Sequence, residues 1–142
     1  MAASPGAPVS AEALAGVSLF AGLARRDRAL LAALMRDVSF PAGTEMTSVG
    51  HDGVVFFVVA EGRAVVQVGG ETRRILGVGD YFGEMALIDR APQSARVVAQ
   101  SDIRCYGLAA WNFKPFVREH PDVAWTLLET LVSRLREAES RA

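Results

Sequence analysis

The chain has 142 residues, a hydrophobic content of 51% and a formal net charge of -1 at pH 7. This length allows one sizeable hydrophobic core and hardly a second, so we expect a single globular domain. The near-neutral charge excludes a global basic field that would hold nucleic acid or an anionic membrane, and we expect neither as a direct partner. The single cysteine, Cys105, excludes an internal disulfide and a cysteine-clustered zinc site, which fits a reducing cytoplasm.

The first two thirds of the chain predict a helix followed by a series of short strands. Residues 1–10 are small and Pro-containing, and we expect them to be flexible. A helical pattern begins at Ala11, and apolar residues recur at three- and four-residue spacing over 29–35. After Asp37 the sequence changes to short β-type runs separated by Gly- and Pro-containing turns. The expected strands are 38–40, 45–47, 54–59, 64–68, 73–78, 96–99 and 103–108. Turn signals at this spacing indicate a sandwich, jelly roll or barrel.

The carboxyl-terminal part returns to a helical pattern at Trp111. Pro115 is tolerable in the first turn of one helix, and His120-Pro121 ends that helix before a second. The second helix has an apolar stripe at alternating spacings of four and three: Ala124, Leu128, Leu131, Leu135 and Ala138. We expect this stripe to cover the β-rich part; pairing across a homodimer and movement as a lid are the alternatives. We expect Trp111 and Trp125 in the core, although Trp125 could also stack on a base.

The most informative segment is 82–99, which reads Phe-Gly-Glu-Met-Ala-Leu-Ile-Asp-Arg-Ala-Pro-Gln-Ser-Ala-Arg-Val-Val-Ala. Gly83 lets the backbone approach a ligand closely, and the good helix formers after it can open a short helix up to Leu87. The backbone N–H groups at such a helix start bind anions, because they have no intrahelical partner and the helix dipole adds positive charge. Glu84 beside an anion is awkward for phosphate alone, but its carboxylate can accept a hydrogen bond from a sugar hydroxyl.

This segment resembles the phosphate-binding cassette of cyclic nucleotide-binding domains, and the resemblance extends from about Leu19 to Arg136. It implies a mainly β fold with flanking α-helices. The fold is the cyclic nucleotide-binding β-roll, a double-stranded β-helix or jelly roll, with an amino-terminal helix and two carboxyl-terminal helices. The resemblance implies one domain over 11–139, with the roll at about 38–110 and the last helices at about 111–139. The expected ligand is cAMP in preference to cGMP, bound reversibly and without a cofactor.

The expected ligand-binding residues are those of the cassette: Gly83, Glu84, Met85, Ala86, Leu87, Gln93, Ser94 and Ala95. In the family the glutamate binds a ribose hydroxyl and an arginine clamps the phosphate, but Gln93 stands at the arginine position here. Hydrogen bonds to charged groups are worth roughly 1.5–3 kcal/mol, so we expect affinity to fall by roughly ten- to a hundredfold. Arg90 at the loop tip and Arg96, one strand alternation from Ser94, are candidates to compensate for the missing charge.

Two functions fit these residues. The first is a small-molecule sensor that signals through movement of its carboxyl-terminal helices; in the family this movement uses a contact that would join Leu87 to Phe116 here. The second is a degenerate β-roll that has lost its ligand and serves as a protein-interaction module. The retained Gly83, Glu84 and Ala95 favour the sensor, because a drifting pocket would be expected to lose Glu84 as well.

The residues do not indicate an enzyme. His51 and His120 are a poor metal-ligand set, and no spacing suggests a Ser–His or Cys–His pair, so we expect neither catalysis nor a metal. Transcription regulators with this sensor carry a further helix-turn-helix domain. We therefore expect the output to pass to another chain, an unidentified effector protein, unless the sequence is an excised domain. Only Lys114 among the 15 Lys and Arg residues is lysine, which resembles usage in GC-rich bacterial genomes.

Overall fold

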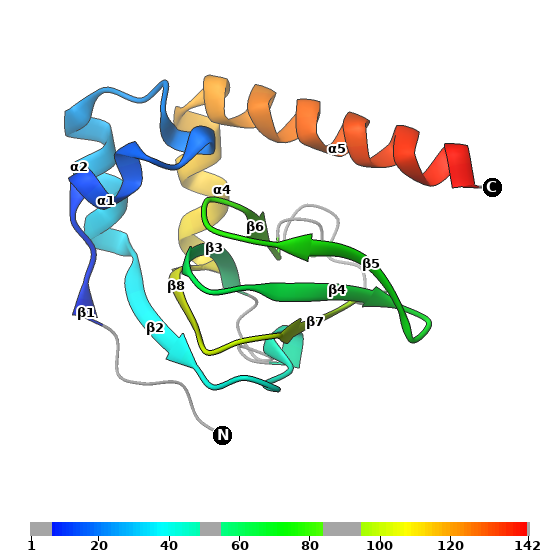
Figure 1. Cartoon of the computed structure of the whole chain (residues 1–142). Coiled ribbons are helices and arrows are strands. Elements are labelled where there is room, and N and C mark those ends of the chain that lie inside the picture. Colours follow the sequence, from blue (N-terminus) through cyan, green and yellow to red (C-terminus); the bar gives the residue numbers. More distant parts are fainter. Residues whose placement is uncertain (1–6, 49–54, 84–94, 142) are drawn as a thin grey trace.

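The computed structural model describes residues 7–48, 55–83 and 95–141, which fold as two β-sheets with helices packed against the first (Figure 1). In chain order the elements are β1 (Ala7–Pro8), α1 (Ala11–Ala15), the 3-10 turn η1 (Ser18–Phe20), α2 (Arg25–Leu34), β2 (Arg36–Phe40), the 3-10 turn η2 (Met46–Ser48), β3 (Val55–Glu61), β4 (Ala64–Val68), β5 (Glu71–Leu76), β6 (Tyr81–Phe82), β7 (Arg96–Ala99), β8 (Ile103–Ala109), α4 (Ala110–Glu119) and α5 (Pro121–Arg141). The mainly β architecture with flanking helices is confirmed.

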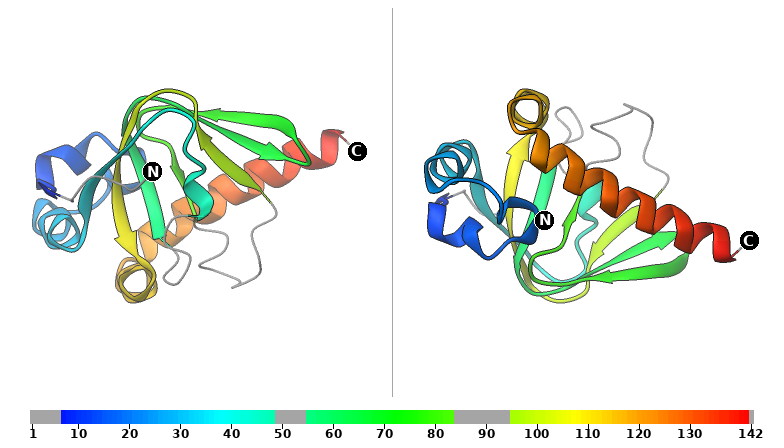
Figure 2. Two further views of the ribbon diagram at one scale, coloured as in Figure 1. Left: turned by 90° about the horizontal axis from the view of Figure 1, so that it is seen from below. Right: turned by 90° about the horizontal axis from the view of Figure 1, so that it is seen from above.

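The strands of the described residues form two antiparallel sheets, with the order β1-β2-β8-β3-β6 in the first and β5-β4-β7 in the second. In the first sheet β3 pairs with β8 from Val55 opposite Ala109 to Glu61 opposite Arg104. In the second sheet β4 lies between β5 and β7 and pairs with both. Figure 2 shows that the two sheets meet where the chain passes from one to the other and diverge from there. This arrangement of two sheets is the predicted β-roll.

Two hydrophobic cores lie on opposite faces of the first sheet. The helix-side core consists of Val9, Leu14, Val17, Leu19, Phe20, Leu23, Leu31, Ala32, Met35, Phe56, Val58, Tyr81, Tyr106, Leu108, Phe113, Phe116, Val123 and Leu127. The roll core, between the sheets, consists of Phe40, Met46, Phe57, Val59, Ala64, Val66, Leu76, Phe82, Val97, Ala99, Ile103 and Cys105. Successive side chains of a strand point to opposite faces, so neighbours such as Phe56 and Phe57 enter different cores.

Two short strands were not predicted, and one predicted strand is wrong. β1 and β6 have two residues each, which is too short for an alternating pattern to be recognised. Residues 45–47 were expected as a strand, but the chain forms η2 there and keeps only a single bridge between Glu45 and Val98. The strands 64–68 and 96–99 have the predicted bounds.

The predicted break between the two carboxyl-terminal helices is confirmed. α4 ends at Glu119, His120 is its C-cap and α5 begins at Pro121. Proline suits a first helical position, because its φ is already helical and its missing N–H would have no partner there. Pro115 lies inside α4 rather than in its first turn, since the helix begins at Ala110. The chain therefore has a defined joint at residue 120.

The direction of the α5 stripe differs from the prediction. Val123 and Leu127 are the α5 side chains in the helix-side core, whereas Leu128 and Leu135 are 51% and 58% exposed. Trp111, expected in the core, is also exposed. The exposed large apolar residues of α5 are Trp125, Leu128, Val132 and Leu135, here called the outer α5 stripe. Apolar spacing identifies a helix, but it does not say which of two adjacent apolar faces meets the core.

Candidate functional site

Most of the predicted cassette lies outside the described residues. This holds for Glu84, Met85, Ala86, Leu87, Arg90, Gln93 and Ser94. The structure describes Gly83, where the chain enters this segment, and Ala95 and Arg96, where the chain leaves it. The site is therefore built from these two ends and from the walls of the roll around them.

The entry to the cassette is a buried strand followed by a glycine with a left-handed backbone. Tyr81 and Phe82 of β6 pair with Val58 and Phe57 of β3. Gly83 has φ of +97°, a conformation that glycine adopts without the steric cost that a Cβ atom would add. Tyr81 belongs to the helix-side core and Phe82 to the roll core. The strand that leads into the cassette is thus anchored in both cores.

Where the chain leaves the cassette, Ala95 and Arg96 point to opposite faces of the second sheet. Ala95 packs against the roll core, which includes Val97 and Ala99 of β7. Alternation then places Arg96 on the outer face of this strand, where its Nε atom lies 2.5 Å from Oε1 of Glu45. The Arg96 side chain is 60% exposed. The structure therefore gives no support for Arg96 as a positive charge inside the roll.

A basic residue that the sequence did not single out lies on the inner wall of the second sheet. Arg74 of β5 is opposite Val66 of β4, and Val66 is opposite Val97 of β7. Residues directly opposite in an antiparallel pair share a face, and both valines belong to the roll core. A register shift between Val66 and Gln67 marks a β-bulge. Because a bulge resets which residues face inward, the adjacent Arg73 and Arg74 could not be assigned to faces from the sequence.

Aromatic rings connect β6 to α4 through the helix-side core. The ring centroid of Phe56 lies 5.5 Å from that of Tyr81 and 5.2 Å from that of Phe113. Phe116 is buried and packs edge-on against Phe20, with ring centroids 6.3 Å apart. The predicted contact of Phe116 with the cassette falls outside the described residues. The strand that enters the cassette and the penultimate helix nevertheless share one packed core.

His120 ties the joint between α4 and α5 to α2. Its ring stacks on Phe116 with centroids 4.3 Å apart, and its Nδ1 lies 2.9 Å from the Phe116 carbonyl oxygen. A carbonyl oxygen only accepts hydrogen bonds, so Nδ1 carries the proton of this contact. Nε2 lies 3.7 Å from Oδ1 of Asp27, an ion-pair distance when the imidazole is protonated. The amino-terminal helices thus contact the joint between α4 and α5.

Basic residues of α5 reach both β6 and β5. The guanidinium carbon of Arg134 lies 5.6 Å from the centroid of the Tyr81 ring. Nη2 of Arg141 donates to the carbonyl oxygen of Arg73 over 3.3 Å. α5 extends beside β5 in Figure 1, in agreement with this contact. The last helix is therefore in contact with the strand before the cassette and with one edge of the second sheet.

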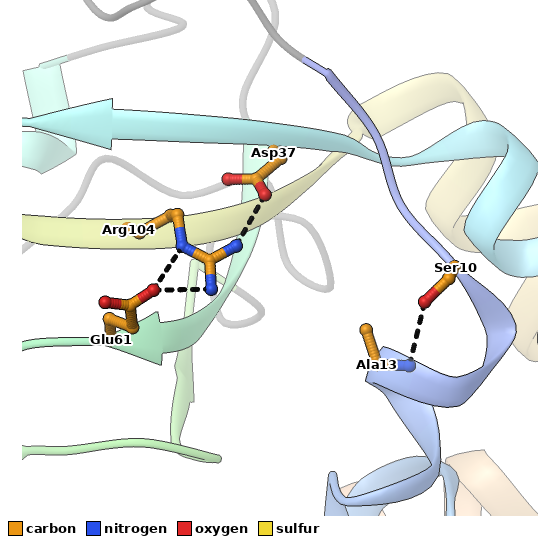
Figure 3. A network of polar contacts seen from close by, with 5 residues as sticks. All are labelled: Ser10, Ala13, Asp37, Glu61 and Arg104. Atoms are coloured by element: carbon orange, nitrogen blue, oxygen red, sulfur yellow. Dashed lines mark hydrogen bonds and ion pairs between the residues drawn. The ribbon is translucent and has the colours of Figure 1, made fainter.

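Figure 3 shows a polar network that holds strands together rather than forming a binding site. Nη1 of Arg104 on β8 lies 2.6 Å from Oδ2 of Asp37 on β2. Its Nη2 lies 2.6 Å from Oε2 of Glu61 on β3. Hydrogen bonds to Asp37 and Glu61 raise the pKa of Arg104 above its ordinary value. The same figure shows the cap of α1, where the Ala13 N–H donates to Ser10 Oγ over 3.1 Å.

Other kinds of site find little basis in the part of the chain that the structure describes. Burial raises the pKa of Cys105 to about 12, which keeps the side chain a neutral thiol at physiological pH. Among residues 7–48, 55–83 and 95–141, no group of three His, Cys, Asp or Glu side chains is placed to hold a metal ion. Within the same ranges, no helix is both long enough and apolar enough to span a membrane.

Comparison with known proteins agrees with the fold. The model of the family described as "Cyclic nucleotide-binding domain" matches residues 37–120, more than half of the chain. The cyclic AMP receptor protein of Thermus thermophilus is 33% identical over 129 residues, which cover 87% of this chain and 60% of that protein. The cGMP-dependent protein kinase of Toxoplasma gondii is 32% identical over 95 residues, which cover 67% of this chain and 10% of that protein.

Solved structures confirm the β-roll. The cAMP-bound structure of PfPKA-R has a TM-score of 0.77 and 25% identity to this chain, with coverage of 91% of this chain and 46% of that one. The chain spans less than two thirds of the length of each of these relatives. Its fold, the retained cassette residues and the match to the family model lead to one conclusion: the chain belongs to the cyclic nucleotide-binding domain family.

Proposed function

We propose that this chain is a regulatory sensor domain that binds a cyclic nucleotide reversibly in its roll and signals through movement of α4 and α5. The observation that carries the proposal is the position of Tyr81 and Phe82 directly before the cassette, with one side chain in each core. A ligand that shifts this strand would disturb the helix-side core, which contains Phe113 and Phe116 of α4 and Val123 of α5. The joint at residue 120 gives these helices a place to turn.

The ligand class is supported by the cassette sequence and by the relatives. Glu84 would accept a hydrogen bond from a ribose hydroxyl, and backbone N–H groups after Gly83 would bind the cyclic phosphate. Gln93 would contact the phosphate without the positive charge of an arginine. Affinity should therefore be roughly ten- to a hundredfold lower than with arginine at this position. The names of the Thermus protein and of the PfPKA-R structure favour cAMP, whereas the Toxoplasma kinase is named for cGMP. Both nucleotides are therefore candidates.

The proposed role is regulatory rather than catalytic, and the output passes to an effector protein. The ligand is exchanged without a cofactor or metal, and the domain acts in the cytoplasm. Direct binding to nucleic acid or to a membrane is not proposed, because a net charge of -1 supplies no attractive field for a polyanion. A bacterial relative with the same domain is consistent with a bacterial source.

A roll that has lost its ligand and works as a protein-interaction module is the second candidate. The outer α5 stripe favours it, because four exposed apolar side chains on one helix form a surface suited to a protein partner. Either an effector protein or a second copy of the chain could cover this stripe; the second case is a homodimer through the carboxyl-terminal helix. The stripe is equally available in a chain that does bind nucleotide.

Isothermal titration of the chain with cAMP and cGMP tests the proposal, beside the variants Glu84→Ala and Gln93→Arg. We expect the wild type to bind at least one nucleotide, Glu84→Ala to lose it, and Gln93→Arg to bind roughly tenfold or more tightly. Glu119→Ala, which removes an exposed carboxylate at the end of α4, is the matched control and should bind as the wild type does. Binding by Gln93→Arg alone would support the module that has lost its ligand. Absence of heat from every variant at millimolar nucleotide would contradict a sensor.

A further inference from the structure

The outer face of α2 is apolar and exposed. Leu30 and Leu34 lie four residues apart on this helix and are 62% and 44% exposed. Ala29 and Ala33, each one residue before a leucine, are also exposed. Residues four apart stand above one another on a helix, so these four side chains form two adjacent rows, here called the α2 strip. The helix-side core takes Leu31 from the other face of α2, so this helix is apolar on two faces and only one of them meets the core.

Positive charge lies at both ends of the α2 strip. Arg26, in the first turn of α2, is exposed and has no ion-pair partner among the described residues. Arg36 lies just beyond the other end of the helix, where its Nη1 donates to the Met35 carbonyl oxygen over 2.8 Å. It too has no carboxylate partner within the described ranges. The ten residues of α2 span about 15 Å, which separates the two arginines by about three helical turns.

The carboxylates close to α2 along the chain are already engaged elsewhere. Glu12 of α1 forms an ion pair with Arg25, with 2.6 Å between Oε1 and Nη2. Oδ1 of Asp27 faces the joint between α4 and α5. Asp37 is bound by Arg104 on the first sheet. These acids do not offset the two arginines, so the α2 strip is an apolar surface with a positive rim.

We propose that the α2 strip is a docking surface for a helix of a partner protein, with leucine-type side chains on one face and acidic side chains near both ends of that face. The leucine row is a ridge and the alanine row beside it is a groove, so a partner helix can place an apolar ridge of its own on the alanines. Carboxylates at its two ends would then meet Arg26 and Arg36, and such rim charges select the partner. A partner can bind this surface whether or not the roll holds a nucleotide.

Two other occupants suit the α2 strip less well. A second copy aligned with the strip in either direction would bring arginine against arginine at both ends, and like charges oppose association. An anionic membrane is usually bound through large apolar side chains such as Trp, Phe and Leu, whereas half of this strip is alanine. Figure 1 places α2 at the opposite side of the molecule from the last turn of α5, so the strip is separate from the outer α5 stripe.

Titration of the full chain with two synthetic helical peptides, followed by NMR, tests the docking surface. Each peptide has about 18 residues, long enough to be helical, and the same leucine face; one carries glutamates at both ends of that face and the other carries lysines. We expect the glutamate peptide to bind about tenfold or more tightly than the lysine peptide and to shift the amide signals of α2. Leu30→Glu should weaken it by about tenfold or more. Leu135→Glu, which changes a 58% exposed leucine on the outer α5 stripe, is the matched control and should bind as the wild type does.

Arg26→Glu tests the charge rule without loss of the fold, because glutamate suits the first turn of a helix. It should weaken binding of the glutamate peptide and strengthen binding of the lysine peptide. No binding of the glutamate peptide at millimolar concentration, equal binding of the two peptides, or unchanged affinity in Leu30→Glu would overturn the proposal. Self-association in sedimentation velocity that Leu30→Glu abolishes would assign the strip to a second copy instead. Binding to phosphatidylserine vesicles that the same variant abolishes would assign it to a membrane, and either result overturns the proposal.

Discussion

The helix-side core and the roll core lie on opposite faces of one sheet, and they differ in what covers that sheet, which is helices on one side and the second sheet on the other. Aromatic rings pack against one another on the helix side, where Phe56 lies between Tyr81 and Phe113. The wall that the second sheet contributes to the roll core is made of alanine, valine and leucine, with Arg74 at its end. The roll core has aromatic rings too, but they lie on the first sheet, where the ring centroid of Phe57 is 5.7 Å from that of Phe40 and 5.3 Å from that of Phe82. In the proposed function, the helix-side core transmits displacement to the helices and the roll side faces the ligand.

The largest effect expected from this comparison is that of Phe56→Ala. Phe56 is 1% exposed, and removing a buried phenyl ring typically costs about 3–5 kcal/mol of unfolding free energy. Urea unfolding followed by circular dichroism measures this change. Ile75→Ala on β5 is the control, because Ile75 is 56% exposed and its truncation should cost no more than about 0.5 kcal/mol. A loss below about 1 kcal/mol for Phe56→Ala would contradict a tightly packed helix-side core.

Val66→Ala should have a smaller effect on stability and a distinct effect on binding. The substitution removes two methyl groups from the roll core, which corresponds to roughly 1.5 kcal/mol of lost burial plus a cavity term. Because Val66 lines the inner face of the roll and its side chain has no hydrogen-bonding group, we expect weaker binding of cGMP and cAMP by a similar factor. Titration of both nucleotides measures it. An altered ratio between them would contradict this expectation and show that the wall contributed by the second sheet helps to select the base.

Cys105 should make the unfolding free energy of the chain depend on pH in the alkaline range. Its thiol has a pKa of about 12 in the folded chain, because burial disfavours the thiolate. The folded state therefore holds this proton more tightly than the unfolded state. The contribution to stability is complete below the ordinary thiol pKa and is lost as pH rises from there toward 12. Unfolding free energies between pH 7 and pH 10 should fall more steeply for the wild type than for Cys105→Ala. Parallel curves would indicate that the thiol is accessible to water.

Leu128→Glu on the outer α5 stripe should have the smallest effect on the stability of the chain. Leu128 is 51% exposed, so we expect a change within about 0.5 kcal/mol. If a second copy covers the stripe, the same variant will weaken self-association, which sedimentation velocity detects at several concentrations. Val123→Ala, in the helix-side core on the same helix, is the matched contrast and should lower stability without a specific effect on association.

The sequence predicted the strands and helices better than it predicted the direction in which individual side chains point. Strands such as 64–68 and 96–99 have the predicted bounds, because each is a short run rich in valine that ends at residues typical of turns, Gly69 and Gly70 after the first and Ser101 and Asp102 after the second. The outward direction of Leu128 was not predictable, since two neighbouring faces of α5 are both apolar and the choice depends on the partner core. The inward direction of Arg74 depends on a β-bulge, and a bulge has no reliable signature in a single sequence.

For the site, too, the sequence predicted the segment correctly but not the direction of one side chain. The motif in the sequence identified the cassette, and the structure places Phe82, the residue before Gly83, in the roll core and packs Ala95 against it. Arg96 was predicted as a compensating charge, yet the structure pairs it with Glu45 on the outer face. That pairing joins residues 51 positions apart, a contact that local alternation does not reveal. The cassette could be predicted from a local motif alone. The face of the sheet to which a side chain points could not, because it depends on how distant strands pair.

The most direct test of the central claim is a distance measurement between α5 and the second sheet with and without nucleotide. Spin labels at Leu135→Cys and Glu71→Cys occupy exposed positions on α5 and β5, and the buried Cys105 would not react with the label. Double electron–electron resonance should show a shifted distance distribution at a saturating concentration of whichever cyclic nucleotide the titration shows to bind, and Glu84→Ala in the same background should show none. An unchanged distribution in a chain that titration shows to be fully bound would contradict signalling through these helices.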